Sequence, residues 1–145
     1  MAEAYASAIV PADATDVWRV VRDFNGLPDW HPGVNGSVIE DGPQSTEVGS
    51  IRRLTLGDGG EVREKLVAVD DTARSYTYDI LTSPFAVRSY RATIRLTPVT
   101  ATGQTFAEWW TRFDADAADE PQLTTFLTED VFAAGLRALS DRFGG

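Results

Sequence analysis

Hydrophobic and polar residues alternate with a period of two through the middle of the chain, as in strands that bury one face. These segments are rich in β-branched and aromatic residues, and short stretches of Gly, Pro, Asp and Ser separate them. The pattern predicts strands at Ala4–Val10, Val34–Glu40, Ser50–Leu56, Glu61–Asp70, Ser75–Thr82, Val87–Pro98 and Gln104–Asp114. Because the connections from Val34 onward are short, we expect an antiparallel meander.

Helical spacing occurs on either side of this meander. Asp13 stands at an N-cap position before apolar residues spaced as in a helix from Val17 to Phe24, and Leu27–His31 adds at most one turn. Pro121 opens a final segment, to about Phe143, whose apolar stripe is wider than a half-buried helix needs. The order of elements predicts a single α+β domain over residues 1–145, in which one sheet wraps around one long C-terminal helix.

Composition narrows the function classes. The chain has 145 residues, 13 Lys+Arg against 22 Asp+Glu, and a formal net charge of −9, which argues against binding nucleic acid or anionic lipid surfaces. It has no cysteine and one histidine, so we expect neither disulfides nor thiol chemistry, and neither a metal nor another cofactor. No segment approaches the ~20 apolar residues of a membrane span, and no leader pattern precedes Tyr5, which predicts a cytoplasmic protein.

Three charged residues fall on strand faces that are otherwise apolar. Glu64 is in phase with Val62 and Leu66, and Arg52 is in phase with Leu54. Glu108 is in phase with Phe106 and Trp110. An ionised group in dry packing costs several kcal/mol, so these positions predict ion pairing, water or a bound ligand inside the sheet. A cavity with a polar lining satisfies all three conditions.

Other assignments of these charges remain open. Trp109 and Phe113 make the opposite face of the last strand equally plausible as the inner one, which would turn Glu108 outward. The cluster is also compatible with a structural ion-pair network beside a small or collapsed cavity. Tyr78 and Tyr90 are natural neighbours of such a cluster, because a buried phenol needs a hydrogen-bond partner. His31, in a loop flanked by prolines, has a position suited to the mouth of a cavity.

Segments spread over nearly the whole chain resemble one known superfamily. They are Phe24–Val34, Val48–Leu54, Arg63–Leu66, Tyr76–Ile80, and Glu108 and Trp109 with Phe113. Their order and spacing are similar to the polyketide cyclase/dehydrase and lipid-transport branch of the START, or birch-pollen-allergen-like, helix-grip superfamily. The resemblance implies a helix-grip fold: a seven-stranded antiparallel sheet wrapped around a long C-terminal helix, two short helices after the first strand, and a large cavity for hydrophobic small molecules.

The resemblance also implies where a ligand would bind. Plant abscisic-acid receptors are similar in layout, although this chain lacks their gate motifs and has His31 in the region of their pocket lysine. Correspondence with the family and the phase of the strands together give the expected ligand-binding set. It comprises Trp30, His31, Arg52, Leu54, Val62, Glu64, Leu66, Tyr78, Ile80, Tyr90, Ala92, Glu108, Trp110, Leu127, Val131 and Gly135. Gly135 is expected to leave room for the ligand.

Two functions compete on this basis. The first is a binding protein that encloses a polyketide, isoprenoid or lipid-like molecule and holds its polar end with the Arg/Glu/Tyr cluster. The second is a polyketide cyclase/aromatase or dehydratase that uses a cavity carboxyl or His31 as acid and base. A pure interaction domain has no specific support, although a monomer and a homodimer formed through a gate loop are both compatible with the sequence. We expect a hydrophobic small molecule as the partner.

Overall fold

The computed structural model describes residues 1–42 and 46–145 and contains one antiparallel sheet of seven strands. The strand order is β1-β7-β6-β5-β4-β3-β2, so all neighbours are sequential except β1, which pairs with β7. The strands are β1 (Ala2–Val10), β2 (Val34–Glu40), β3 (Ile51–Leu56), β4 (Glu61–Asp70), β5 (Ser75–Thr82), β6 (Ser89–Pro98) and β7 (Thr105–Asp114). The predicted meander is confirmed, with small shifts at a few strand ends.

Two short helices follow β1, as expected. Helix α1 (Ala14–Val21) begins where the Asp13 carboxylate accepts a hydrogen bond from the Thr15 backbone N–H at 2.8 Å. The 3₁₀ helix η1 (Phe24–Asp29) begins in the same way at Asp23. An aspartate at each N-cap satisfies an N–H group that the first turn leaves without a partner.

The C-terminal helix is continuous but changes its winding. Its parts are α2 (Glu120–Thr125), the π-helical segment η2 (Phe126–Ala133) and α3 (Ala134–Arg142). A uniform α-helix with 100° between residues is therefore the wrong description of its middle. In η2 the backbone bonds join residues five apart, which brings residues i and i+5 closer to one face than α-helical winding does.

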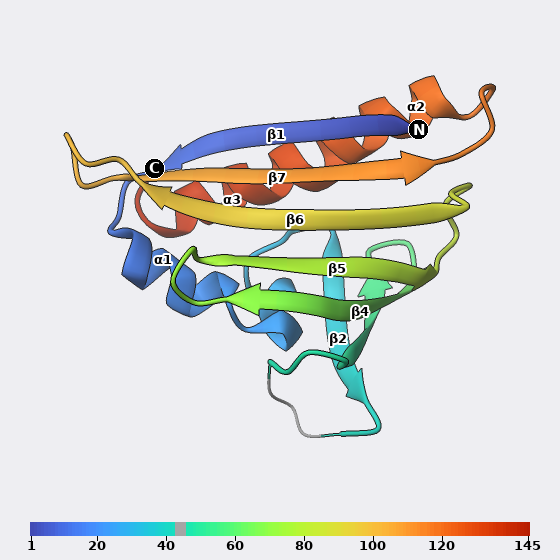
Figure 1. The fold of residues 1–145 in the computed structure, drawn as a ribbon, viewed down its shortest axis with the longest axis horizontal. Coiled ribbons are helices and arrows are strands. Elements are labelled where there is room, and N and C mark those ends of the chain that lie inside the picture. Colours follow the sequence, from blue (N-terminus) through green and yellow to red (C-terminus); the bar gives the residue numbers. More distant parts are fainter. Residues whose placement is uncertain (43–45) are drawn as a thin grey trace.

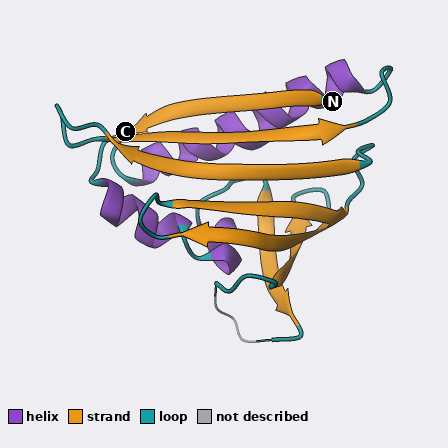
Figure 2. Ribbon diagram, viewed as in Figure 1, coloured by secondary structure: helices purple, strands orange, loops and turns teal. Residues whose placement is uncertain are grey.

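The sheet curls around this helix, so the α+β helix-grip prediction is confirmed (Figure 1). The C-terminal helix lies behind β1, β7 and β6 (Figure 1). At the opposite end of the sheet, β2 runs at a steep angle to these three strands. Helix α1 lies beside the end of β4 and the start of β5, at the left of the view (Figure 2). Within the described ranges, no helix is both long and apolar enough to cross a membrane.

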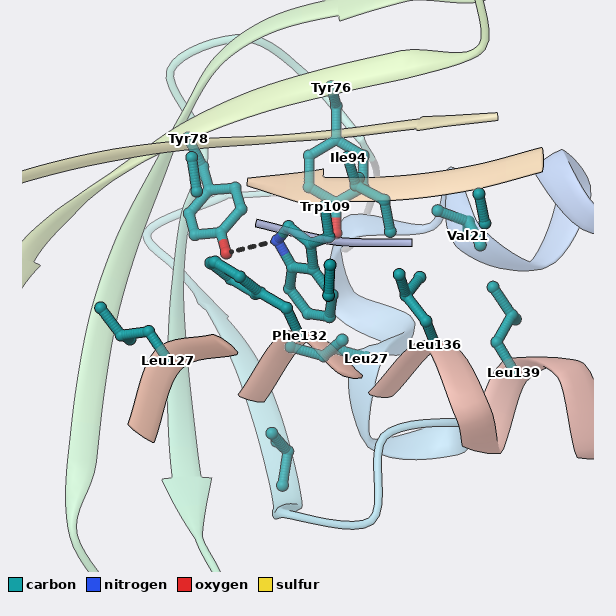
Figure 3. Packing of buried hydrophobic residues seen from close by; sticks show 14 of the residues in the cluster. Val21, Leu27, Tyr76, Tyr78, Ile94, Trp109, Leu127, Phe132, Leu136 and Leu139 are labelled. Atoms are coloured by element: carbon teal, nitrogen blue, oxygen red, sulfur yellow. Dashed lines mark hydrogen bonds between the residues drawn. The ribbon is translucent and has the colours of Figure 1, made fainter. Parts of the chain in front are cut away.

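The main core fills the space between the C-terminal helix and β5, β6 and β7. Phe132, Leu136 and Leu139 project from the helix toward Ile94 and Trp109, and all five are fully or almost fully buried (Figure 3). The Trp109 and Phe132 rings lie 4.9 Å apart between centroids. This packed half leaves the other half of the concave face, around β3, β4 and β5, to form the site.

Candidate functional site

A pocket of about 330 Å³ lies between the concave face of the sheet and the η2 segment of the C-terminal helix. The sheet contributes lining residues from six strands, β2 to β7, and η2 closes the opposite side. Most of the walls are apolar. The apolar lining residues are Leu27, Val34, Leu54, Leu56, Val62, Ile80, Phe85, Trp109, Phe126, Leu127 and Val131.

The polar groups on the buried side of the pocket belong to Glu64, Tyr78 and Tyr90. They come from adjacent strands and point to the same face because their positions have the same parity in the sheet register, with Glu64 opposite Ile80 and Tyr78 opposite Ala92. The rest of the polar lining comes from His31 and from Asp58 and Asp130, which are exposed. The pocket is thus an apolar cavity with a small convergent polar cluster.

Glu64 is held by Arg52, the residue directly opposite it in the β3–β4 ladder. Arg52 Nε donates to Glu64 Oε1 at 2.9 Å. Arg52 Nη2 lies 2.7 Å from the same oxygen, an ion-pair contact whose angle is too poor for a hydrogen bond. Directly opposed residues of antiparallel strands have close Cβ atoms, so the hairpin register alone brings the two charges together.

Arg52 is completely buried and enclosed by aromatic rings. Its guanidinium carbon lies 4.0 Å from the centre of the Phe24 ring, and Nη1 donates to the Phe24 carbonyl at 2.8 Å and toward Tyr76 Oη at 3.4 Å. Burial alone would lower the pKa of Arg52, but the tyrosine hydroxyls and Glu64 raise it above its ordinary value. Burial raises the pKa of the Glu64 carboxyl, and Arg52 opposes that rise.

Two phenols and an indole continue the polar cluster along the sheet. Trp109 Nε1–H donates to Tyr78 Oη at 3.1 Å, which Figure 3 shows as a dashed line. The Tyr78 and Tyr90 hydroxyl oxygens lie 3.4 Å apart. Burial raises the pKa of both phenols well above their ordinary value, with neighbouring Tyr and Glu64 groups adding to it, so both stay protonated at neutral pH.

His31 is only 4% exposed and bridges the pocket wall to the C-terminal helix. Its Nε2 lies 2.7 Å from the Val131 carbonyl oxygen, and its Nδ1 accepts from the Gly33 backbone N–H at 3.0 Å. A carbonyl only accepts, so Nε2 carries the proton and the ring is neutral. Burial, followed by the nearby positive charge of Arg52, lowers the pKa of His31 against the opposing effect of the Val131 hydrogen bond.

Aromatic contact marks the solvent side of the pocket. The Phe85 ring, in the segment between β5 and β6, lies 5.2 Å from the Phe126 ring of η2, and both rings line the pocket. Asp58, in the turn between β3 and β4, and Asp130, on η2, are the exposed lining residues on this side that carry charge.

The structure brings a large part of the predicted set together around this pocket. His31, Leu54, Val62, Glu64, Tyr78, Ile80, Tyr90, Leu127 and Val131 all line it. Arg52, Leu66, Ala92 and Trp30 are buried but stand outside the lining. Arg52 lies behind Glu64, and the Trp30 ring packs 5.8 Å from the Trp109 ring.

Glu108 and Trp110 correct the prediction, because they lie on the outer face of β7. The inner face of that strand consists of Thr105, Ala107, Trp109, Thr111 and Phe113, all buried. Glu108 instead accepts a hydrogen bond from the Tyr5 hydroxyl at 2.6 Å and from Arg95 at 3.2 Å. Trp110 is stacked by the Arg95 guanidinium, 5.5 Å from the ring centre. Each face of β7 carries one Trp and one Phe, so aromatic size does not distinguish the two faces. Trp109 and Phe113 are the buried pair, and Tyr5 and Arg95 satisfy Glu108 on the outer face.

Gly135 is a second correction. It faces inward as predicted but leaves no room for a ligand, because a Cβ at this position would lie 2.6 Å from His31 Cδ2 and 2.9 Å from Trp109 Cζ3. The glycine therefore serves the close approach of the helix to these two rings.

Several lining residues escaped the sequence reasoning. Trp109 was weighed only as an alternative, and Phe126 and Asp130 were missed because π-helical winding moves them toward Val131. Leu27 lies within the short 3₁₀ helix η1, and the others lie in loops or at element ends, where periodicity gives no facing direction; these others are Gly33, Val34, Gly57, Asp58 and Phe85. Leu56 could have been predicted from the sequence, because it is in phase with Leu54 on the same strand.

Comparison with known proteins places the chain in a family. It belongs to the polyketide cyclase / dehydrase and lipid transport family, whose model matches residues 1–144. No curated protein matches the sequence.

Solved structures agree over nearly the whole chain. A protein from Thermobifida fusca is 32% identical with a TM-score of 0.88, and the match covers 99% of this chain and 94% of that one. The protein XoxI from Bacillus cereus is 29% identical with a TM-score of 0.88, covering 99% and 96%. The Zhui aromatase/cyclase from a Streptomyces species is 20% identical with a TM-score of 0.80, covering 97% and 92%, and shows the shared fold.

Proposed function

We propose that this protein binds an apolar small molecule, of polyketide, isoprenoid or lipid-like character, in the pocket between the sheet and η2. The observation that carries the proposal is the combination of about 330 Å³ of mostly apolar space with Glu64, Tyr78 and Tyr90 converging on its buried side. Pockets for small ligands have this composition, in which apolar walls supply affinity and a few polar groups set orientation. Membership of a family described by cyclases, dehydrases and lipid transport supports the same class of ligand.

Catalysis as a polyketide cyclase/aromatase or dehydratase is the alternative, and the geometry supports it less well. A general acid or base needs a proton position free to reach the substrate. Both nitrogens of His31 are already engaged, by Val131 and Gly33, and Glu64 is held by the Arg52 guanidinium. The likeness to the aromatase/cyclase is in the fold alone.

Binding of the dye 1-aminoanthracene tests the proposal. This dye is uncharged at neutral pH and fluoresces strongly in apolar surroundings. We expect saturable, blue-shifted emission with wild-type protein that has been stripped of co-purified compounds. Native mass spectrometry before stripping should show an apolar compound bound to part of the sample.

A matched pair of tryptophan substitutions locates the dye. Val62 is 2% exposed and lines the pocket, whereas Val38 is 50% exposed and lies outside it. Val62→Trp should fill the pocket and abolish dye binding, and Val38→Trp should bind the dye as wild type does. Equal dye binding by Val62→Trp and wild type, or no saturable binding by wild type, would overturn the proposed function.

A further inference from the structure

The charged groups that face the pocket are all acidic. Its lining includes the carboxylates of Glu64, Asp58 and Asp130, and no lysine or arginine is present among the described lining residues. The one lining imidazole, His31, is neutral in its hydrogen-bonded arrangement. A ligand that enters therefore passes the two exposed carboxylates and meets a third on the buried side.

Arg52, the cation that contacts the lining carboxylate Glu64, is shielded from the pocket by this partner. Arg52 is 0% exposed and outside the lining, while Glu64 both lines the pocket and contacts Arg52. Nε and Nη2 of Arg52 both contact Glu64 Oε1, and Nη1 donates to the Phe24 carbonyl and toward Tyr76 Oη. An anionic ligand beside Glu64 would contact the Glu64 carboxylate and would be separated by it from Arg52. The charge of the ligand would then be buried without a cationic partner, which is strongly unfavourable.

The phenols leave one hydrogen-bond donor beside this carboxylate. Tyr78 and Tyr90 have two hydroxyl protons and one contact between them, at 3.4 Å. Tyr78 Oη also accepts from Trp109. Whichever tyrosine donates to the other, one phenol proton remains outside that contact, so this side of the pocket presents an acceptor carboxylate and a neutral donor hydroxyl.

We propose that the pocket selects uncharged apolar ligands that carry a hydroxyl or amino donor for Glu64, and excludes carboxylates and phosphates of the same apolar body. This inference rests on the proposed function and narrows its ligand class. A hydrogen bond from a neutral donor to an ionised acceptor contributes about 1.5–3 kcal/mol, which corresponds to roughly 10- to 100-fold in affinity. Fatty acids and phospholipids are then poor ligands, whereas phenols and alcohols of similar size are good ones.

Competition against bound 1-aminoanthracene tests this selection with four probes that share a naphthalene body. At pH 7.5, 2-naphthol is neutral with a donor, naphthalene is neutral without one, and 2-naphthoate is an anion. We expect 2-naphthol to compete best and 2-naphthoate worst, with at least about tenfold between them. 2-Naphthyl phosphate should compete as poorly as 2-naphthoate.

Two variants assign the selection to the lining carboxylates. Glu64→Gln removes the negative charge that stands between Arg52 and the pocket. The ratio of the affinity for 2-naphthol to the affinity for 2-naphthoate should therefore shrink or reverse. Asp58→Asn combined with Asp130→Asn alters only exposed side chains, which keeps the test available if Glu64→Gln does not fold. In this double variant the ratio should also move toward 2-naphthoate, by a smaller factor.

The outcomes separate the two proposals. Saturable dye binding with 2-naphthoate competing as well as 2-naphthol, or better, would overturn the selection and leave the proposed function intact. A preference for 2-naphthol that neither variant changes would overturn the role of the lining carboxylates. Failure of the dye and of every naphthalene to bind would overturn the proposed function and this inference together.

Discussion

The ion pair between Arg52 and Glu64 is the residue-scale feature on which the site depends. The two side chains are directly opposed in the β3–β4 register. Each charge compensates its partner for part of the hydration that the partner loses on burial. The phase of Glu64 with Val62 and Leu66 was enough to predict an interior carboxylate. The partner depends on the exact register of the hairpin: the observed pairing is centred on Asp58, which sets Arg52 opposite Glu64, whereas a turn centred between Asp58 and Gly59 would set Arg53 there.

Removing Glu64 should strand a buried cation. We predict that Glu64→Ala lowers the free energy of unfolding by about 3–5 kcal/mol. Glu108→Ala is the matched control, because Glu108 lies on the outer face with Tyr5 and Arg95 as partners, and surface pairs contribute about 0–1 kcal/mol. Urea unfolding measures both. Equal losses in the two variants would show that Glu64 is not an interior ion-pair partner.

His31 contributes a pH dependence to the stability of the protein that sets in below the ordinary histidine pKa of 6.5. Burial holds the pKa of His31 below its ordinary value of 6.5, so below pH 6.5 the unfolded chain binds a proton that the folded one resists. Stability from this group is complete above pH 6.5 and is lost as the pH falls, by at most about 1.4 kcal/mol per pH unit.

The histidine contribution can be isolated by substitution. Between pH 7.5 and pH 5.5, the free energy of unfolding should fall more steeply for wild type than for His31→Gln in urea titrations. The carboxyls whose pKa is lowered by arginine partners, such as Glu40 beside Arg63 and Asp71 beside Arg22, titrate at lower pH. Parallel profiles for wild type and variant would contradict a buried neutral His31.

At the scale of elements, the C-terminal helix approaches β7 and the loop before β2 through Gly135. At an ordinary position inside a helix, replacing glycine by alanine raises stability by up to about 1 kcal/mol. Here the new Cβ would overlap the rings of His31 and Trp109, and overpacking costs typically 1–3 kcal/mol. We therefore predict a net loss of stability in thermal unfolding.

A second glycine provides the comparison for this contact. At Gly36, in β2, a Cβ would have the Thr55 Cβ as its nearest neighbour, at 4.0 Å. Gly36→Ala should thus be neutral or stabilising by about 0.5–1 kcal/mol. A Gly135→Ala variant as stable as Gly36→Ala would mean that the helix does not pack this closely on His31 and Trp109.

The winding of the same helix shows where sequence reasoning about elements stops. Its extent followed from Pro121 and the apolar stripe, and the structure agrees to within a residue or so at each end. The π-helical stretch Phe126–Ala133 did not follow, because local residue types favour helix without specifying the hydrogen-bond step. Packing against the sheet and the hydrogen bond from His31 to the Val131 carbonyl act on this stretch, and both are tertiary effects.

At the scale of the whole molecule, the curl of the sheet determines the size and the lining of the pocket. Alternation predicted the strands and the inner faces of β3, β4, β5 and β6. For β7 both faces carry aromatic residues, so the choice between Trp109 and Trp110 depended on which pair the helix covers. The volume of the pocket, and which loop residues line it, depend on the curvature of the sheet and on the position of the helix. No local sequence pattern encodes either of these.

The two tryptophans of β7 offer the most direct measurement of whether the hollow half of the fold holds a ligand. In ¹H–¹⁵N NMR spectra, the indole N–H signals of Trp109 and Trp110 can be assigned with Trp109→Phe and Trp110→Phe and followed during titration with 2-naphthol. Trp109 lines the pocket and donates to Tyr78, whereas Trp110 lies on the outer face beside Arg95. The account predicts a saturable shift of the Trp109 signal with the Trp110 signal unmoved. A Trp109 signal that stays in place at saturating 2-naphthol, or a shift at Trp110 alone, would contradict it.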